Sequence, residues 1–259
     1  MFSTIGFHES VDAAGAQQDL TPALADAIVR TQGDRIYVPE LTQLVLAAAG
    51  VGSGGNGTAR LETPELLKMG RHYIAPVNGA NDGNVEPDSP HAVEDLRAMP
   101  LALVKGEGIL GTVHSNTTAA ALQWIIAWLA DGPIAPVAMP HFTTRLTGTT
   151  TLVASTWTLC QLTPDENLPR GRYAIVGMRV LSATGIAARL VLAGQGARPG
   201  VLCVDAVTDL QWPGFRHGGM GVFGEWEDTD AIQVEVLANA GDTAETVWLD
   251  LAPIRLGPG

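Results

Sequence analysis

The amino-acid sequence predicts an all-β protein made of two tandem antiparallel jelly-roll domains, with a short N-terminal helical arm in front of them. Three observations lead to this prediction. Short apolar segments alternate with clusters of turn residues along most of the chain, which is typical of sandwiches and barrels. Helical periodicity is scarce after residue 100. The third observation is a loose internal repeat.

The repeat relates residues 58–61 to residues 187–190, and residues 128–134 to residues 248–254. Their spacings are 129 and 120 residues. A period of this length is too long for a solenoid or a propeller, so each copy is predicted to be a whole β-domain with its own core. At 259 residues the chain is long enough for two domains of ordinary size.

An N-terminal arm is predicted over residues 1–33, which are polar and rich in alanine. It contains one predicted helix, residues 21–30. Thr21 can cap this helix, and Pro22 suits its first position because the N–H that proline lacks would have no helical partner there. The arm is therefore not expected to form part of a domain.

The first jelly roll is predicted over residues 34–132 and the second over residues 146–256, joined by residues 133–145. This joint is short. Its three prolines cannot continue a central strand and make the joint stiff. The clearest strand signal is the alternation of apolar and polar side chains over residues 232–236. The predicted strands are residues 35–39, 41–48, 58–62, 72–77, 101–104, 109–114, 121–129, 149–162, 173–182, 186–193, 200–207, 222–226, 232–237 and 246–254.

The net charge of −12 and the pI near 4.8 argue against a nucleic-acid-binding protein, because such binding depends on clustered lysine and arginine. Only Lys68 and Lys105 among the 15 basic residues are lysines. Arginine suits planar ion pairs at protein interfaces, and a coding bias of a GC-rich gene is an equally good explanation of its excess. The N-terminus lacks the features of a signal peptide and no apolar segment is long enough to cross a membrane, so a soluble, unexported protein is expected.

Neither an enzyme activity nor a cofactor is predicted. Gly52 to Gly57 match the G-x-G-x-x-G fingerprint of dinucleotide sites, but no helix pattern follows, which favours a flexible loop between strands. The six histidines are scattered without an H-x-H or H-E-x-x-H motif, so no metal site is predicted from them. Cys160 and Cys203 lie in apolar segments and are expected to be small buried side chains.

A weak candidate for a cation site is the polar segment that contains Asp82, Glu86 and Asp88, together with Asn81 and Asn84. Their oxygens are the ligands that a hard cation such as calcium prefers. The spacing differs from that of an EF-hand, and these residue types favour turns for reasons of their own backbone. A solvated cluster of turn residues is therefore the preferred interpretation.

Glu225 and Glu227, which flank Trp226, could resemble the carboxylate pair of a glycosidase. Two acidic residues on the solvent face of a strand, with Trp226 in the core, are the simpler interpretation. Ser155 lies in strand-like sequence with no base nearby in the sequence, which argues against a serine hydrolase.

The six tryptophans divide into groups by their surroundings. Trp212 lies in a loop close to Phe215 and Arg216, and these three residues are the candidates for contacts with a partner, because aromatic and arginine side chains often anchor interfaces. Four others lie in apolar strands and are expected in a core or a subunit interface: Trp124, Trp128, Trp157 and Trp248.

With two jelly-roll-like halves, a proline-rich joint and the arginine bias, the chain resembles the double jelly-roll major capsid proteins of tailless icosahedral viruses. The resemblance spans residues 34–256. The segments that carry it are residues 128–134, 189–195 with 198–200, and 234–238 running into 242–244. The family is held together by fold more than by motif, so no residue-level site is transferred.

The resemblance implies a structural virion protein. Its partners would be two further copies in a homotrimer, whose six barrels form a pseudo-hexagonal capsomer, then neighbouring capsomers and other capsid proteins of an icosahedral shell. Assembly in the host cytoplasm is expected, with no sequence-specific nucleic-acid binding and no transmembrane segment.

Two alternatives from other classes stay open. The first is a carbohydrate-binding, lectin-like pair of β-sandwiches, which would need exposed aromatic residues and a cation site near Asp82 or Trp212. The second is a β-sandwich enzyme that uses Glu225 and Glu227.

Overall fold

Strands and turns make up most of the chain. The computed structural model describes residues 1–11, 17–23, 30–37, 42–52, 57–63, 72–80, 93–115, 121–204, 211–243 and 245–254. Within these ranges the helical structure is the short 3-10 turn η2 (Pro213–Phe215), and no helix there is long and apolar enough to cross a membrane. The prediction of an all-β fold is confirmed.

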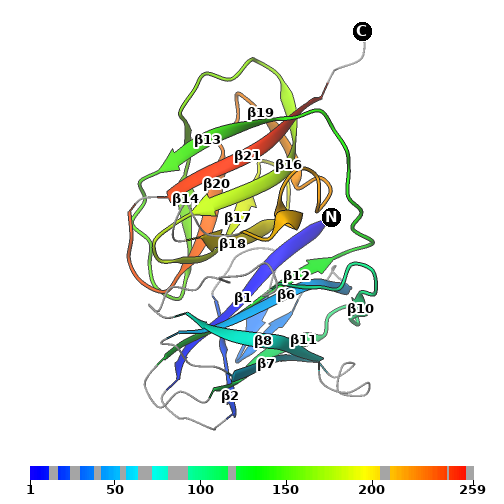
Figure 1. Ribbon diagram of the computed structural model, residues 1–259, viewed down its shortest axis with the longest axis vertical. Helices are drawn as coiled ribbons and strands as arrows, with labels where there is room; N and C mark the ends of the chain where they lie inside the picture. The colour runs from blue at the N-terminus through cyan, green and yellow to red at the C-terminus, as the bar shows by residue number, and fades with distance from the viewer. Residues whose placement is uncertain are drawn as a thin grey trace.

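The strands form two sheets, which Figure 1 shows as two bodies, one above the other. We call residues 1–130 the first body and residues 142–254 the second body. The first body contains β1 (Phe2–Val11), β2 (Gln17–Asp19), β3 (Thr21–Pro22), β4 (Arg30–Gln32), β5 (Arg35–Tyr37), β6 (Gln43–Gly52), β7 (Gly57–Glu62), β8 (His72–Ala80), β9 (Val93–Asp95), β10 (Leu101–Ala102), β11 (Gly108–Ser115) and β12 (Ala121–Ala130). The second contains β13 (Phe142–Gly148), β14 (Trp157–Gln161), β15 (Thr163–Pro164), β16 (Arg172–Leu181), β17 (Gly185–Val191), β18 (Gly200–Val204), β19 (Gly224–Glu227), β20 (Gln233–Ala238) and β21 (Glu245–Ile254).

The two bodies repeat one strand order. It runs β1-β12-β6-β8-β7-β11 in the first body and β13-β21-β16-β18-β17-β20 in the second. The directions also agree, since β8 is parallel to β6 and antiparallel to β7, as β18 is parallel to β16 and antiparallel to β17. Six shorter strands also correspond. In the first body β3 pairs with β1, β2 with β11 and β9 with β6. In the second body β15 pairs with β13, β14 with β20 and β19 with β16. The internal repeat in the sequence therefore has a counterpart in the strand order.

Strand β12 is buried on both faces, which explains why its sequence is apolar except at Gln123. One row of side chains, which includes Ile125 and Leu129, faces the interior of the first body. The other row, which includes Trp124, Ile126 and Trp128, belongs to a core that continues into the second body. The two bodies are therefore held together by a shared apolar core as well as by the chain that joins them.

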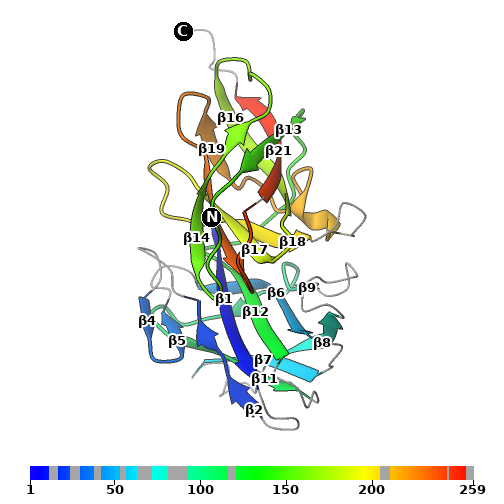
Figure 2. The same cartoon turned by 90° about the vertical axis from the view of Figure 1, so that its left-hand side faces the viewer.

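The predicted N-terminal helical arm is not seen. Residues 2–11 form β1, which pairs with β12 along its whole length, from Phe2 opposite Ala130 to Val11 opposite Ala121 (Figure 2). Part of the predicted helix is β3, and Arg30 begins β4, while residues 24–29 lie outside the described residues. Burial of alternate apolar side chains of β1 in the first body stabilises this segment as a strand.

The boundaries of two further predicted elements differ. Strand β13 begins at Phe142, inside the segment predicted as the joint. The predicted strand over residues 149–162 is shorter, because only Trp157–Gln161 pairs as β14. Ser155 interrupts it with a φ of 61°, a left-handed backbone that a strand cannot contain.

Candidate functional site

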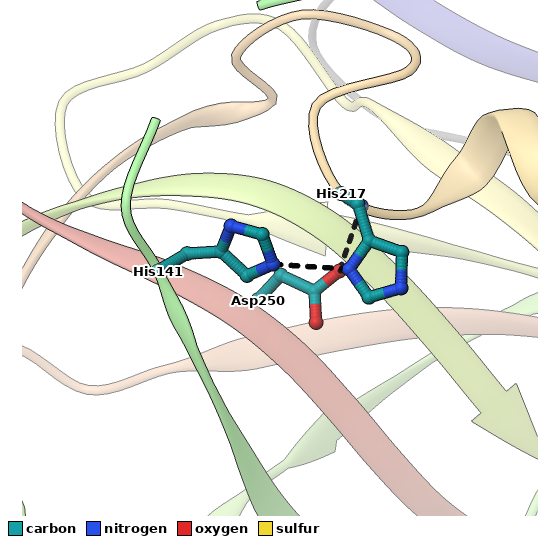
Figure 3. Close-up of side chains that lie close together, drawn as sticks. All are labelled: His141, His217 and Asp250. Atoms are coloured by element: carbon teal, nitrogen blue, oxygen red, sulfur yellow. Dashed lines mark hydrogen bonds and ion pairs between the residues drawn. The ribbon is translucent and has the colours of Figure 1, made fainter. Parts of the chain in front are cut away.

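Two histidines and one aspartate meet on the second body, although they come from three separate segments (Figure 3). His141 is the last residue of the joint as the structure has it, residues 131–141 between β12 and β13. His217 follows η2, and Asp250 lies in β21. One ring nitrogen from each histidine and one carboxylate oxygen lie within 4.8 Å of one another. The sequence places no two histidines to share a metal on one strand or helix face, but folding brings together two that are 76 positions apart.

The hydrogen bonds of the cluster determine which ring nitrogens carry a proton. His141 Nε2 lies 3.0 Å from His217 Nδ1, which lies 3.3 Å from Asp250 Oδ2. The Met139 carbonyl, 2.8 Å from His141 Nδ1, can only accept, so His141 Nδ1 carries the proton and its Nε2 presents a lone pair. In the neutral pair, the proton between the two rings therefore belongs to His217 Nδ1.

Asp250 is the buried member of the cluster, with its side chain 3% exposed. Its Oδ1 accepts a hydrogen bond from the Thr143 hydroxyl at 2.7 Å, and its Oδ2 accepts one from the backbone N–H of His217 at 2.8 Å. These bonds fix the carboxylate in one orientation. The His217 side chain is 55% exposed, so the cluster is open to solvent on its outer side.

The backbone around the cluster is unusual at two positions. His217 has a φ of 55°, which is uncommon for any residue except glycine and is often found at functional sites. A Cβ atom on Gly177 would lie 2.3 Å from Asp250 Oδ2 and 2.9 Å from the His217 backbone nitrogen. A register shift between Ile175 and Gly177 in the pairing of β16 with β21 places this glycine directly opposite the aspartate on the neighbouring strand. The absence of a side chain at Gly177 leaves the space that the cluster occupies.

The predicted interface residues Trp212, Phe215 and Arg216 lie near this cluster, in and beside η2. Phe215 is fully buried, with its ring centroid 5.4 Å from that of Trp128 and 5.0 Å from that of Trp212, so it packs inside the chain. Trp212 is half-buried, and the guanidinium carbon of Arg97 in the first body lies 5.0 Å from its ring centroid. Arg216 is half-buried. Phe215 and Trp212 thus contribute to the junction between the two bodies.

Glu225 and Glu227 lie on the exposed face of β19, with Trp226 buried on the other face, as the simpler interpretation predicted. Both line an open depression of about 730 Å³. Glu225 forms an ion pair with Arg172, which also lines this depression. Glu225 is therefore engaged in an ion pair on an exposed strand face, which fits the simpler interpretation.

Two other predicted features lie in segments outside the described residues. They are residues 53–56 of the glycine-rich loop and the candidate cation ligands Asp82, Glu86 and Asp88. The loop is followed by strand β7, whereas a dinucleotide site would need a helix there. Both cysteines are buried and free, as predicted, and burial raises the pKa of Cys160 to about 11.

A serine and a histidine that are far apart in the sequence meet at the junction of the bodies. Ser155 Oγ lies 2.8 Å from His8 Nδ1. Burial lowers the pKa of His8 to about 4, and its Nε2 has no hydrogen-bond partner among the described residues. A general base needs a pKa closer to neutrality and a third group that orients the ring. The contact therefore fits a bond between the two bodies better than an activated nucleophile.

Glu245, at the start of β21, is a buried carboxyl group whose replacement should change how stability depends on pH. Glu245 is 1% exposed, and this burial raises its pKa from 4.5 to about 7. The charge of Asp242 makes a smaller contribution in the same direction. The folded chain therefore favours the protonated form, so stability falls as the pH rises from 4.5 to 7. Glu245→Gln is expected to raise the free energy of unfolding at pH 8 by on the order of 2 kcal/mol, with little change near pH 4.5.

Urea unfolding at the two pH values measures this difference. Glu227→Gln is the matched control, because Glu227 is exposed and its replacement should change stability by less than about 0.5 kcal/mol at either pH. An equal effect of Glu245→Gln at both pH values would show that the carboxyl group is not protonated on folding.

Among solved structures, the chain is similar to the major capsid protein P2 from Bacteriophage PM2. The two share 12% sequence identity, the match covers 100% of both chains, and the TM-score is 0.28. The likeness is loose at these values and transfers no residue. No family model and no curated protein matches the chain.

Proposed function

We propose that the protein is a major capsid protein, which trimerises into pseudo-hexagonal capsomers and assembles an icosahedral shell. The observation that carries this proposal is the strand order found twice in one chain. In each body, four strands pair side by side as β1-β12-β6-β9 or β13-β21-β16-β19. Four more pair as β2-β11-β7-β8 or β14-β20-β17-β18. Two sets of four strands in each body support an eight-stranded jelly roll, an architecture that capsid proteins use.

The junction between the bodies supports a stiff building block. The backbone of Thr4 in β1 donates to the Arg198 carbonyl at 2.9 Å and accepts from Arg189 at 3.1 Å. Trp128 Nε1 donates to the Gly200 carbonyl at 2.8 Å. A ring of six barrels in a capsomer closes only if the angle between the two barrels of each chain is fixed, and these bonds fix it.

Lectins also use jelly rolls, so the surface must separate the two functions. A sugar would have to stack on an exposed aromatic ring, but Arg97 already lies over the ring of Trp212. The acidic net charge leaves genome contact to another component of the virion, in which the chain would be located after assembly in the host cytoplasm.

Light scattering and electron microscopy of the purified protein test the proposal. A trimer of the 27.1 kDa chain is expected, with interfaces that bury on the order of 2,000 Å² or more in total. Higher salt should favour larger tiles or shells, because it screens the repulsion between subunits of charge −12. Monomers at every salt concentration and pH would contradict the proposal, and monomers that bind a glycan array would favour the lectin alternative.

A further inference from the structure

Three donor atoms of the His141, His217 and Asp250 cluster have the spacing of a tetrahedral metal site. Zinc binds histidine nitrogen and carboxylate oxygen at about 2.0–2.2 Å, which puts tetrahedral ligand atoms about 3.3–3.6 Å apart. The distances are 3.0 Å between the two ring nitrogens and 3.3 Å between His217 Nδ1 and Asp250 Oδ2, and all three donor atoms lie within 4.8 Å of one another. Small rotations of the two exposed histidine side chains would bring the donors to bonding positions around the buried Asp250.

We propose that this cluster binds one divalent transition-metal cation of the zinc class, through His141 Nε2, His217 Nδ1 and Asp250 Oδ2. The cation takes the place of the proton that His217 Nδ1 now shares with its neighbours. That proton moves to His217 Nε2, which points away from the cluster (Figure 3). Water fills the fourth position on the exposed side. Two imidazoles and one carboxylate suit zinc, whereas magnesium and calcium prefer oxygen ligands alone.

The outer hydrogen bonds of a metal site are already in place. A histidine that binds a metal commonly donates its other ring N–H to a carbonyl or a carboxylate, which fixes the ring and its tautomer. His141 Nδ1 donates in this way to the Met139 carbonyl at 2.8 Å. The carboxylate oxygen of Asp250 that is not needed for the cation accepts from Thr143 at 2.7 Å. Both ligands are thus oriented before any cation binds.

The metal would link the joint to the second body, because its ligands come from both. The loop of residues 216–221 that carries His217 also receives a backbone hydrogen bond from Val137 of the joint, whose N–H lies 2.9 Å from the Gly218 carbonyl. Arg97 of the first body donates to the Gly219 carbonyl of the same loop. A cation that ties His141 to His217 and Asp250 therefore stabilises the place where the joint and both bodies meet.

Calorimetric titration of the chelator-treated protein with ZnCl₂ tests the proposal, with MgCl₂ and CaCl₂ as comparisons. One equivalent of zinc per chain is expected, and excess zinc should raise the melting temperature. His141→Ala should weaken zinc binding at least about tenfold and abolish that rise. His141 is exposed and lies outside the strands, so this replacement should not disturb folding. His217→Asn tests the second ligand without straining the backbone, because asparagine tolerates a positive φ.

His114→Ala is the matched control, because His114 is an exposed histidine on β11 of the first body. It should bind zinc as the unchanged protein does. The proposal is overturned if the unchanged protein binds no zinc, if both cluster variants bind it with unchanged affinity, or if magnesium or calcium binds as tightly. Loss of binding in His114→Ala would place the metal elsewhere and overturn it as well. Zinc binding does not depend on assembly, so the two proposals can fail separately.

Discussion

Replacing Arg189 with methionine is expected to lower the free energy of unfolding by about 3–5 kcal/mol. Arg189, in β17, is fully buried. Its Nε donates to Glu235 Oε2 at 2.6 Å, its Nη1 donates to the Thr4 carbonyl of the first body, and its guanidinium lies 4.3 Å from the ring centroid of Trp157. The variant leaves the Glu235 side chain, which is 12% exposed, without its closest positive charge. Urea unfolding measures the loss.

Two further variants separate the buried pair from a general effect of removing arginine. Arg145 and Asp165 form an exposed ion pair at 3.2 Å, with side chains 55% and 31% exposed, and Arg145→Met should cost less than about 1 kcal/mol. Adding Glu235→Leu to Arg189→Met should restore part of the stability, because the buried carboxylate that lost its closest positive charge is then gone. If Arg189→Met costs no more than Arg145→Met, neither the buried pair nor the bond from Arg189 to Thr4 contributes measurably to stability.

Strands whose surroundings are simple were predictable from the sequence. In β20, Val234 and Val236 are buried while Gln233 and Glu235 are half-buried, as their alternation predicts. The sequence of β12, apolar except at Gln123, also predicted a strand, and its burial on both faces accounts for that pattern.

Strand β1 was missed because its second face is polar and yet buried. Thr4, Gly6 and His8 alternate with the core residues Ile5 and Phe7, so the local sequence reads as an exposed arm. The partners of this polar face come from the second body. The Arg189 side chain donates to the Thr4 carbonyl, and the Thr4 N–H donates to the Arg198 carbonyl. Leu237 lies close to Gly6, and Ser155 forms a hydrogen bond with His8. A local pattern cannot show contacts with residues more than 140 positions away.

The histidine cluster was missed for the same reason. Metal motifs depend on short spacings within one strand or helix, whereas His141, His217 and Asp250 meet only when the joint, a loop and β21 fold together. The glycines at 218, 219 and 221 beside His217 were a partial signal, because they mark a tight turn.

Trp128→Ala is expected to lower the free energy of unfolding by about 3–5 kcal/mol, because it opens a cavity at the junction of the bodies. Trp128 is fully buried, its ring packs against Phe215, and its Nε1 donates to the Gly200 carbonyl at 2.8 Å. Trp128→Phe keeps most of the apolar contact and loses only that hydrogen bond, so a smaller loss of about 1–2 kcal/mol is expected.

The position of Trp128 also predicts a change in cooperativity. Because its ring joins the two bodies, the alanine variant should let them unfold in separate steps, so that circular dichroism and fluorescence no longer report the same urea midpoint. Trp248 is the matched control: it lies in β21, the strand equivalent to β12, but is half-buried, with the Arg179 guanidinium carbon 5.4 Å from its ring centroid. Trp248→Ala should lower stability by a smaller amount and leave the two midpoints equal. Coincident midpoints in Trp128→Ala, with a loss no larger than in Trp248→Ala, would mean that the junction does not depend on this ring.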